Sequence, residues 1–346
     1  MINKIDILRN DGELSEIDLI FLLQNDDPMV GEYLAQQARE VAETRFGRRV
    51  FVRGLIEITN KCRNGCYYCG INRANREVAR YSLSEEDIME CCHTGYQMGF
   101  RTFVLQGGED PTMNIEWLEG VVSNIRTTFL DCAITLSLGE MPREWYERLY
   151  KAGANRYLLR HESYNEELYN SLHPSDMSHS NRLRSLADLK QIGFQTGTGF
   201  MVGAPNQSID NLVEDILYIK RLSPEMIGIG PFIPHHSTAL AEHKSGSVAM
   251  TLKLISILRL MHPRALIPST TALATLSESG RKDGILAGAN VVMPNLSPTH
   301  RRKEYSLYDN KAAFGAESAE GLKRLQRELE QINYEISYER GDYIQG

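Results

Sequence analysis

Three cysteines gather in one short polar loop, and their types and spacing suit a metal centre. Cys62, Cys66 and Cys69 lie in TNKCRNGCYYCG, separated by three and then two residues. Thiolates are ligands for zinc and for iron–sulfur clusters. A structural zinc site takes four ligands, usually in two pairs; here the pairs are missing, and His93 lies too far along a predicted helix to be an obvious fourth ligand. A disulfide would leave one thiol over, and a catalytic thiol would leave two without a role.

A cluster of the 4Fe-4S type explains why there are three cysteines. Each of its four irons takes one ligand beyond the sulfides, so three thiolates leave one iron open to a further ligand. The loop therefore favours an iron–sulfur centre with a vacant position. The alternative from another class is a metal-binding scaffold without enzymatic activity, with zinc or an iron–sulfur centre held by this loop.

The composition of the whole chain indicates in which compartment this chemistry takes place and which binding partners are excluded. It has 346 residues, six cysteines and a net charge of −7. So few cysteines in a long chain indicate a reducing compartment, and we expect a cytoplasmic location. No run approaches eighteen apolar residues, which predicts no membrane span. The acidic balance argues against non-specific nucleic-acid binding.

Eight short β-prone runs follow residue 49 and alternate with amphipathic helical stretches. This alternation predicts parallel strands joined by helical crossovers. Eight units favour a closed (β/α)8 TIM barrel of the α/β class, with a doubly wound open sheet as the alternative. In a barrel the chemistry lies at the carboxyl ends of the strands, and the three cysteines follow the first run. The runs are 50–58, 101–106, 132–138, 154–160, 194–202, 226–233, 265–270 and 289–294.

The regions outside the barrel are helical. We expect residues 1–48 to form an N-terminal helical extension, in which Ser15 is a helix N-cap. The barrel occupies residues 49–310. Residues 311–346 are expected to form a charged C-terminal helix followed by a loose tail.

The cysteine motif resembles the signature of the radical SAM family. The spacing CxxxCxxC, with Tyr68 immediately before the third cysteine, follows the first strand of a predicted barrel as it does in that family. The resemblance implies one 4Fe-4S cluster on Cys62, Cys66 and Cys69 and an open iron that binds S-adenosylmethionine. It also implies that one electron cleaves this cofactor to a 5′-deoxyadenosyl radical.

The same resemblance implies which residues would hold S-adenosylmethionine. QGGED after the second strand resembles the GGE motif of the family and places Gln106, Gly107 and Gly108 at the cofactor. The resemblance also places three further residues at this cofactor: Tyr68, Glu162 after the fourth strand, and Arg182 at the start of the next helix. From residue types alone, two glycines mark a turn and Arg182 would be a surface residue.

Longer blocks, of which RYLLRHES and IGIGPFIPHH are the most specific, resemble the HydE maturases of FeFe-hydrogenase, a biotin synthase-related branch. This resemblance covers most of residues 50–310. It implies a small anionic substrate, an iron–cysteine complex that carries carbon monoxide and cyanide, and transient contact with other hydrogenase maturases. It leaves the electron donor unidentified. Arg160 would act in catalysis, and the residues lining the substrate end would be Thr135, Ser137, Arg160, Thr270, Thr271 and Tyr305.

The sequence also allows an alternative function, and it departs from some HydE chains in its C-terminal residues. The methylornithine synthase PylB, which rearranges lysine, shares the cysteine spacing and a GEDP motif, and it is the alternative function. Some HydE chains have extra cysteines near the C-terminus; residues 311–346 have none, so we expect a single cluster. Cys91, Cys92 and Cys132 are expected to be packed in the core.

Overall fold

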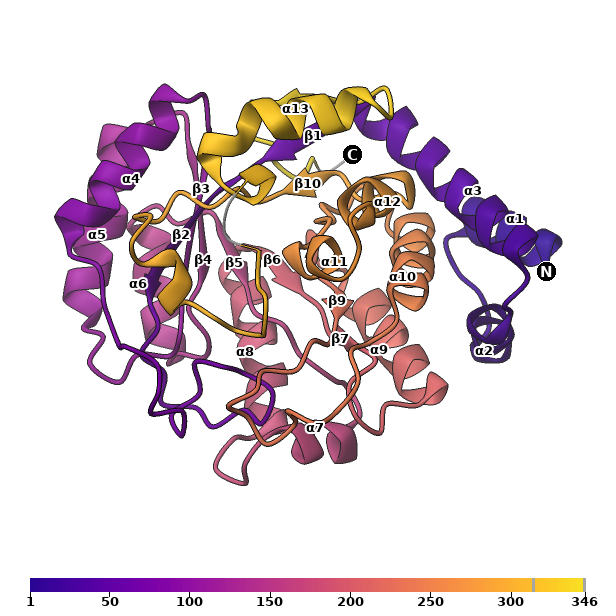
Figure 1. Cartoon of the computed structure of the whole chain (residues 1–346), viewed down its shortest axis with the longest axis horizontal. Helices are drawn as coiled ribbons and strands as arrows, with labels where there is room; N and C mark the ends of the chain where they lie inside the picture. The colour runs from indigo at the N-terminus through magenta and orange to yellow at the C-terminus, as the bar shows by residue number, and fades with distance from the viewer. Residues whose placement is uncertain (313–314, 345–346) are drawn as a thin grey trace.

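The computed structural model describes residues 1–312 and 315–344, and it begins with three helices along one side of a barrel (Figure 1). Ser15 caps the second helix, because its side chain accepts a hydrogen bond from the Asp18 amide at 3.2 Å, as predicted. The third helix packs on α10 (Val248–Met261) of the barrel. These helices are α1 (Ile2–Asp11), α2 (Glu16–Gln24) and α3 (Pro28–Phe46).

Parallel strands form the barrel, and six of them pair side by side in the order β2-β3-β4-β5-β6-β8. Single bridges from Met226 to Leu266, from Pro268 to Val291 and from Asn295 to Leu55 complete the ring. The closed barrel is confirmed, although the seventh predicted strand, 265–270, contributes only the two bridges at Leu266 and Pro268. The strands are β1 (Arg49–Val52), β2 (Gly54–Thr59), β3 (Thr102–Gly107), β4 (Ala133–Ser137), β5 (Arg156–Leu158), β6 (Gln195–Thr198), β7 (Met201–Val202), β8 (Met226–Ile227), β9 (Gly230–Pro231) and β10 (Val291–Val292).

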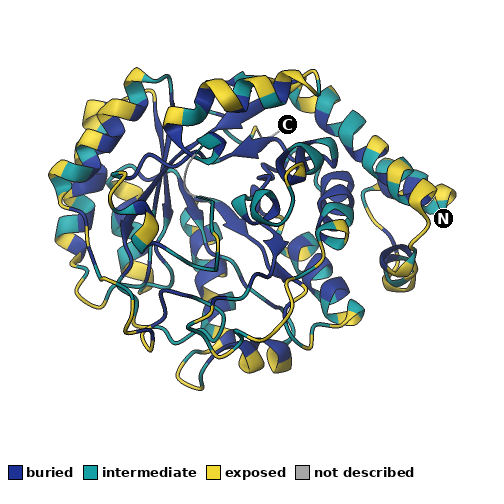
Figure 2. Cartoon of the chain, in the orientation of Figure 1, coloured by how far each residue is buried: buried dark blue, intermediate teal, exposed yellow. Residues whose placement is uncertain are grey.

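Helices cover the outside of the barrel, with their buried sides toward the strands and their exposed sides outward (Figure 2). Two short ones were not predicted: α7, which Asn165 caps, and α11, which begins where a strand was expected to end. Both lie at the carboxyl ends of strands, where they help to shape the mouth. The helices are α4 (Glu85–Gln97), α5 (Ile115–Thr128), α6 (Arg143–Lys151), α7 (Glu166–Leu172), α8 (His179–Ile192), α9 (Ile209–Leu222), α10 (Val248–Met261), α11 (Thr271–Leu276) and α12 (Gly280–Leu286).

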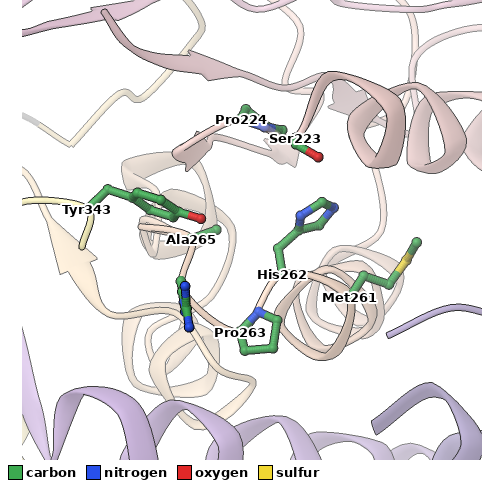
Figure 3. A pocket seen from close by; sticks show the side chains of 8 residues that line it. Ser223, Pro224, Met261, His262, Pro263, Ala265 and Tyr343 are labelled. Atoms are coloured by element: carbon green, nitrogen blue, oxygen red, sulfur yellow. The ribbon is translucent and has the colours of Figure 1, made fainter. Parts of the chain in front are cut away.

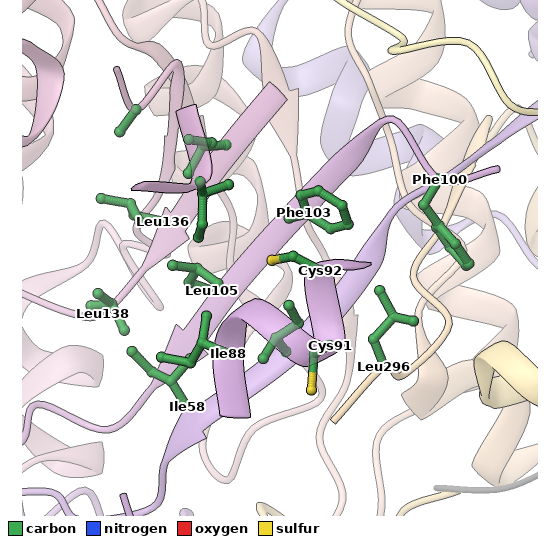
Figure 4. Close-up of a cluster of buried hydrophobic side chains, with 14 of the residues drawn as sticks. Ile58, Ile88, Cys91, Cys92, Phe100, Phe103, Leu105, Leu136, Leu138 and Leu296 are labelled. Atoms are coloured by element: carbon green, nitrogen blue, oxygen red, sulfur yellow. The ribbon is translucent and has the colours of Figure 1, made fainter. Parts of the chain in front are cut away.

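The remaining cysteines are core residues, as expected. Cys91 and Cys92 lie on α4 near Phe103 and Leu296, and Cys132 is also buried (Figure 4). Burial raises the pKa of Cys91 and of Cys132 to about 12, so both thiols are neutral at physiological pH. These three cysteines therefore act as small apolar groups.

The expected C-terminal helix is present, but the described residues that follow it are not loose, so that part of the expectation was wrong. Three short 3-10 helices, η1 (Arg302–Glu304), η2 (Gly315–Glu317) and η3 (Ala319–Gly321), precede α13 (Leu322–Glu330) and β11 (Glu335–Ser337), which pairs with β1. Beyond β11, the fully buried Arg156 donates hydrogen bonds to the carbonyls of Arg340 and Gly341 and to Asp342. A buried guanidinium requires such acceptors, and the tail supplies them. Among the residues described, no helix is long and apolar enough to cross a bilayer.

Candidate functional site

The cysteine loop lies between β2 and α4 and is shaped by hydrogen bonds to one half-buried arginine. Arg80 donates from Nη1 to the carbonyls of Asn60 and Ile71, at 2.6 and 2.7 Å. Its Nη2 donates to the carbonyls of Asn72 and Asn75, at 2.6 and 2.8 Å. Four backbone carbonyls gathered on one guanidinium give an otherwise irregular loop a defined shape.

The three cysteines of the loop are free thiols, and each is half-buried. Burial raises the pKa of each thiol, that of Cys69 to about 12. The thiolates therefore need metal charge beside them, which a 4Fe-4S cluster provides.

Two glycines let the end of β3 approach this loop closely. A Cβ atom on Gly108 would lie 2.3 Å from the Lys61 carbonyl oxygen and 2.7 Å from Cys62 Cβ. A Cβ on Gly107 would lie 2.9 Å from Thr59 Cγ2. Any side chain at Gly108 would therefore displace the backbone that carries the first cysteine.

Arg182 is a buried residue of the mouth and not a surface residue. Its Nε donates to Glu140 Oε1 at 2.6 Å, and its Nη1 donates to the Arg160 carbonyl at 3.1 Å. The Glu140 amide in turn donates to Glu109 Oε1 at 2.8 Å. Glu140 was missed from the sequence, although it is an acidic residue just after a strand, the same signal that identified Glu162.

Arg160 and Glu162 present unpaired polar atoms at the end of β5. Arg160 Nη2 lies 3.2 Å from Glu162 Oε2, yet the two atoms are not aligned for a hydrogen bond. Arg160 Nε is likewise buried without a partner. Glu162 has φ 65°, a left-handed conformation that costs about 1–3 kcal/mol in a residue with a side chain. Such strain, together with buried polar atoms that lack a hydrogen bond, is typical of a site that a ligand completes.

The other predicted substrate residues fall into two groups. The buried hydroxyls of Thr135 and Thr270 have no hydrogen-bond partner, so both are available to a ligand. Gln106 donates from Nε2 to the Tyr305 hydroxyl at 3.3 Å. Thr271, in contrast, donates to Glu317 Oε2 at 2.7 Å, so its hydroxyl is already occupied.

Ser137 and Tyr68 are the remaining predicted residues of the site. Ser137 ends β4 and pairs in register with Gln106. The Tyr68 hydroxyl lies 3.1 Å from His173 Nε2. His173 donates from Nδ1 to the Tyr169 carbonyl at 2.7 Å, so Nε2 accepts from Tyr68. This bond fixes the tyrosine ring beside the third cysteine.

A buried ion pair in contact with Tyr305 was also missed. Glu57, fully buried on β2, pairs with Lys311 and accepts from Asn295 Nδ2 at 2.9 Å. Lys311 also donates to the Tyr305 carbonyl at 3.0 Å. The sequence does contain a signal for this pair: Glu57 is a carboxylate inside an apolar β-run, and a buried carboxylate requires a partner.

Comparison with known proteins agrees with this geometry. Residues 56–219 match the model of the Radical SAM superfamily. The chain is 44% identical over 289 residues to the [FeFe] hydrogenase maturase subunit HydE of Thermotoga maritima, covering 84% of this chain and 82% of that protein. It is 32% identical to the 3-methylornithine synthase of Methanosarcina acetivorans, covering 86% of this chain and 84% of that protein.

Solved structures agree on the fold. The crystal structure of methylornithine synthase (PylB) has a TM-score of 0.85 at 28% identity, covering 96% of this chain and 97% of that chain. Family membership implies a 4Fe-4S cluster and S-adenosylmethionine as cofactors, and the cysteine loop fits the cluster. On these similarities, the chain belongs to the radical SAM superfamily, in the group that contains HydE and 3-methylornithine synthase.

Proposed function

We propose that this protein is a HydE-type maturase that acts in building the FeFe-hydrogenase active site. The observation that carries the proposal is the 44% identity to HydE, against 32% to 3-methylornithine synthase over a similar share of the chain. The RYLLRHES block, which best distinguishes the two in sequence, contains Arg160 and Glu162 with their orphaned polar atoms.

The residues of the loop and of the barrel mouth would divide the cofactor-binding work. Cys62, Cys66 and Cys69 would hold the cluster. The cofactor pair supplies a 5′-deoxyadenosyl radical by one-electron cleavage of S-adenosylmethionine. Arg182 would bind the methionine carboxylate with the guanidinium that Glu140 orients, and Glu162 would accept from the ammonium or ribose. Gln106 and the Gly107–Gly108 backbone would contact the same cofactor. Tyr68, immediately before Cys69, would line the same cofactor site.

Arg160 would bind the substrate through its free donors. Its Nε and Nη2 have no hydrogen-bond partner, and Thr135 and Thr270 add two free hydroxyls. A cation with neutral donors suits an anion, such as an iron–cysteine complex bearing carbon monoxide and cyanide. Ser137, Thr271 and Tyr305 would complete this end, with Thr271 acting through its bond to Glu317.

The alternative is the lysine mutase activity of 3-methylornithine synthase. The likeness to the PylB crystal structure favours it, because the two chains share the fold over nearly their whole length. An arginine and hydroxyls would also bind the carboxylate of an amino acid.

One experiment separates these functions. Protein reconstituted without oxygen should bind about four iron per chain and release 5′-deoxyadenosine from S-adenosylmethionine with dithionite. It should then replace HydE in an in vitro maturation of apo-hydrogenase, and lysine should yield no methylornithine. Formation of methylornithine would establish the alternative, and zinc-containing protein without cleavage would refute both.

A further inference from the structure

A carboxylate on helix α9 binds the chain on both sides of Glu162. Asp215 is fully buried, and its Oδ1 accepts a hydrogen bond from the Tyr164 amide at 2.6 Å. The same oxygen lies 3.2 Å from Nε2 of His161, which is also fully buried. The other oxygen, Oδ2, is buried and has no hydrogen-bond partner in the described part of the chain. A single oxygen of Asp215 therefore fixes the residue before Glu162 and the second residue after it.

The hydrogen bonds of His161 are mutually consistent. The Thr198 hydroxyl lies 2.9 Å from His161 Nδ1, and its oxygen accepts from the His161 amide at 3.3 Å. A hydroxyl that accepts from this amide is free to donate to Nδ1, so Nε2 carries the ring proton and donates to Asp215. These bonds join the end of β6, the segment after β5 and α9 into one buried network.

Glu162 needs this support because its backbone lies in an unfavourable turn. The Ser163 amide donates to the His161 carbonyl at 2.9 Å, which closes a three-residue turn around Glu162. With φ 65° at the central residue, this is the rare and strained form of such a turn. A residue with a side chain keeps such a conformation only where the surrounding structure over-determines it. The Glu162 amide is fixed as well, since it donates to the Gly199 carbonyl at 3.1 Å.

We propose that Asp215 is a positioning residue for S-adenosylmethionine binding, because it holds Glu162 in this turn through His161 and the Tyr164 amide. This role rests on the proposed contact between Glu162 and the cofactor. The turn keeps Glu162 Oε2 at the mouth of the barrel, 3.2 Å from Arg160 Nη2. Without the bonds to Asp215, Glu162 relaxes in a share of the molecules, and the apparent dissociation constant for the cofactor rises as the competent share falls.

The test is the dissociation constant for S-adenosylmethionine, measured by equilibrium dialysis of protein reconstituted without oxygen, with iron per chain counted in the same samples. Asp215→Leu removes both hydrogen bonds. Asp215→Asn keeps an oxygen at the same place, and one oxygen makes both bonds. Glu162→Gln, alone and combined with Asp215→Leu, completes a double-mutant cycle that reports whether Asp215 acts through Glu162.

Met261→Ala is the control for a loss of stability alone. Met261 belongs to the same hydrophobic cluster as the buried face of α9. It lines a hollow of about 190 Å³ together with Ser223, the C-cap of α9 (Figure 3). Ser223 is eight residues beyond Asp215, or about 12 Å along the helix. This variant should melt at a lower temperature than the wild type and bind the cofactor as the wild type does.

We expect Asp215→Leu to raise the dissociation constant at least fivefold with unchanged iron content, and Asp215→Asn to stay within twofold of the wild type. In the Glu162→Gln background, Asp215→Leu should add less than twofold. If Asp215→Leu does not fold, Thr198→Val, which removes only the hydroxyl bonds of His161, should raise the constant at least threefold.

Three results would overturn the positioning role. The first is a smaller rise for the variant that decides the test, the second is an equal rise in Met261→Ala, and the third is the full loss repeated in the Glu162→Gln background. Wild-type affinity in Glu162→Gln itself would instead refute the proposed contact between Glu162 and the cofactor, and the role of Asp215 would be refuted with it.

Discussion

Substitution of Lys311 by methionine should destabilise the protein and weaken cofactor binding together. Lys311 neutralises Glu57, whose carboxylate is fully buried on β2, and Asn295 is the other partner of that carboxylate. Methionine keeps an unbranched stem that is one atom shorter and lacks the ammonium group with its charge and donors. Glu57 would then be a buried carboxylate without a counter-charge.

The structure sets the expected magnitude. Breaking a buried ion pair by removing one partner costs roughly 3–5 kcal/mol. At about 2.1 cal/mol/K per residue, a chain of 346 residues unfolds with an entropy of roughly 0.7 kcal/mol/K. The melting temperature should therefore fall by about 4–7 °C. Because Lys311 also holds the Tyr305 carbonyl, and Tyr305 accepts from Gln106, the affinity for S-adenosylmethionine should fall as well.

The assay is differential scanning calorimetry of anaerobically reconstituted protein at one scan rate, with cofactor affinity measured by equilibrium dialysis. The control is the double variant Glu57→Gln/Lys311→Met, in which no charge is left unpaired. It should recover most of the lost melting temperature, while its cofactor affinity stays low. A single variant that melts within 1 °C of the wild type, or a double variant that melts lower still, would refute the reasoning.

Three further outcomes follow from particular residues. Gly108→Ala should lose most of its iron, because the new Cβ would overlap the backbone of the cysteine loop. Gly31→Ala, with open space around it on α3, should keep its iron and gain about 1 kcal/mol in free energy of unfolding. Iron analysis and thermal melting of both variants check this. Cys66→Ala should bind no intact cluster, while Cys132→Ala keeps the visible absorption of the wild type. Burial lowers the pKa of His262 to about 4, so the unfolded chain takes up a proton there between about pH 6.5 and 4 that the folded chain refuses. The contribution of neutral His262 to the free energy of unfolding is complete above pH 6.5 and declines as the pH falls, by up to about 1.4 kcal/mol per pH unit. Urea titrations at a series of pH values should show a shallower decline for His262→Gln than for the wild type.

The barrel could be predicted because each unit carries its own local signal. Apolar runs of strand length alternate with capped amphipathic helices, and Ser15 behaves as its position implies. The seventh strand was harder to predict, because the sequence ALIPST suits a strand while the structure uses only the bridges at Leu266 and Pro268. A short apolar run does not reveal how many hydrogen bonds its neighbours leave for it.

The site was predictable where the chain itself brings residues together, and less so across the barrel. The three cysteines are close in sequence, and Glu162 follows a strand directly. The partnerships of Glu140 with Arg182 and of Glu57 with Lys311 join residues 42 and 254 positions apart, and no local pattern indicates such distances. The order of the tail was unpredictable for the same reason. Its carbonyl groups accept hydrogen bonds from Arg156, a residue far earlier in the chain.

The position of β1 has a consequence for biosynthesis. This early strand lies between β10 and β11, whose residues are translated some 240 to 290 positions later. The cysteine loop likewise depends on late residues, because Gly70 donates to the Leu307 carbonyl and Asn60 to that of Glu304. The cysteine loop can therefore take the shape described here only after residue 307 has been synthesised. We expect the cluster to be inserted after these residues have been translated, and not into the isolated N-terminal half of the barrel.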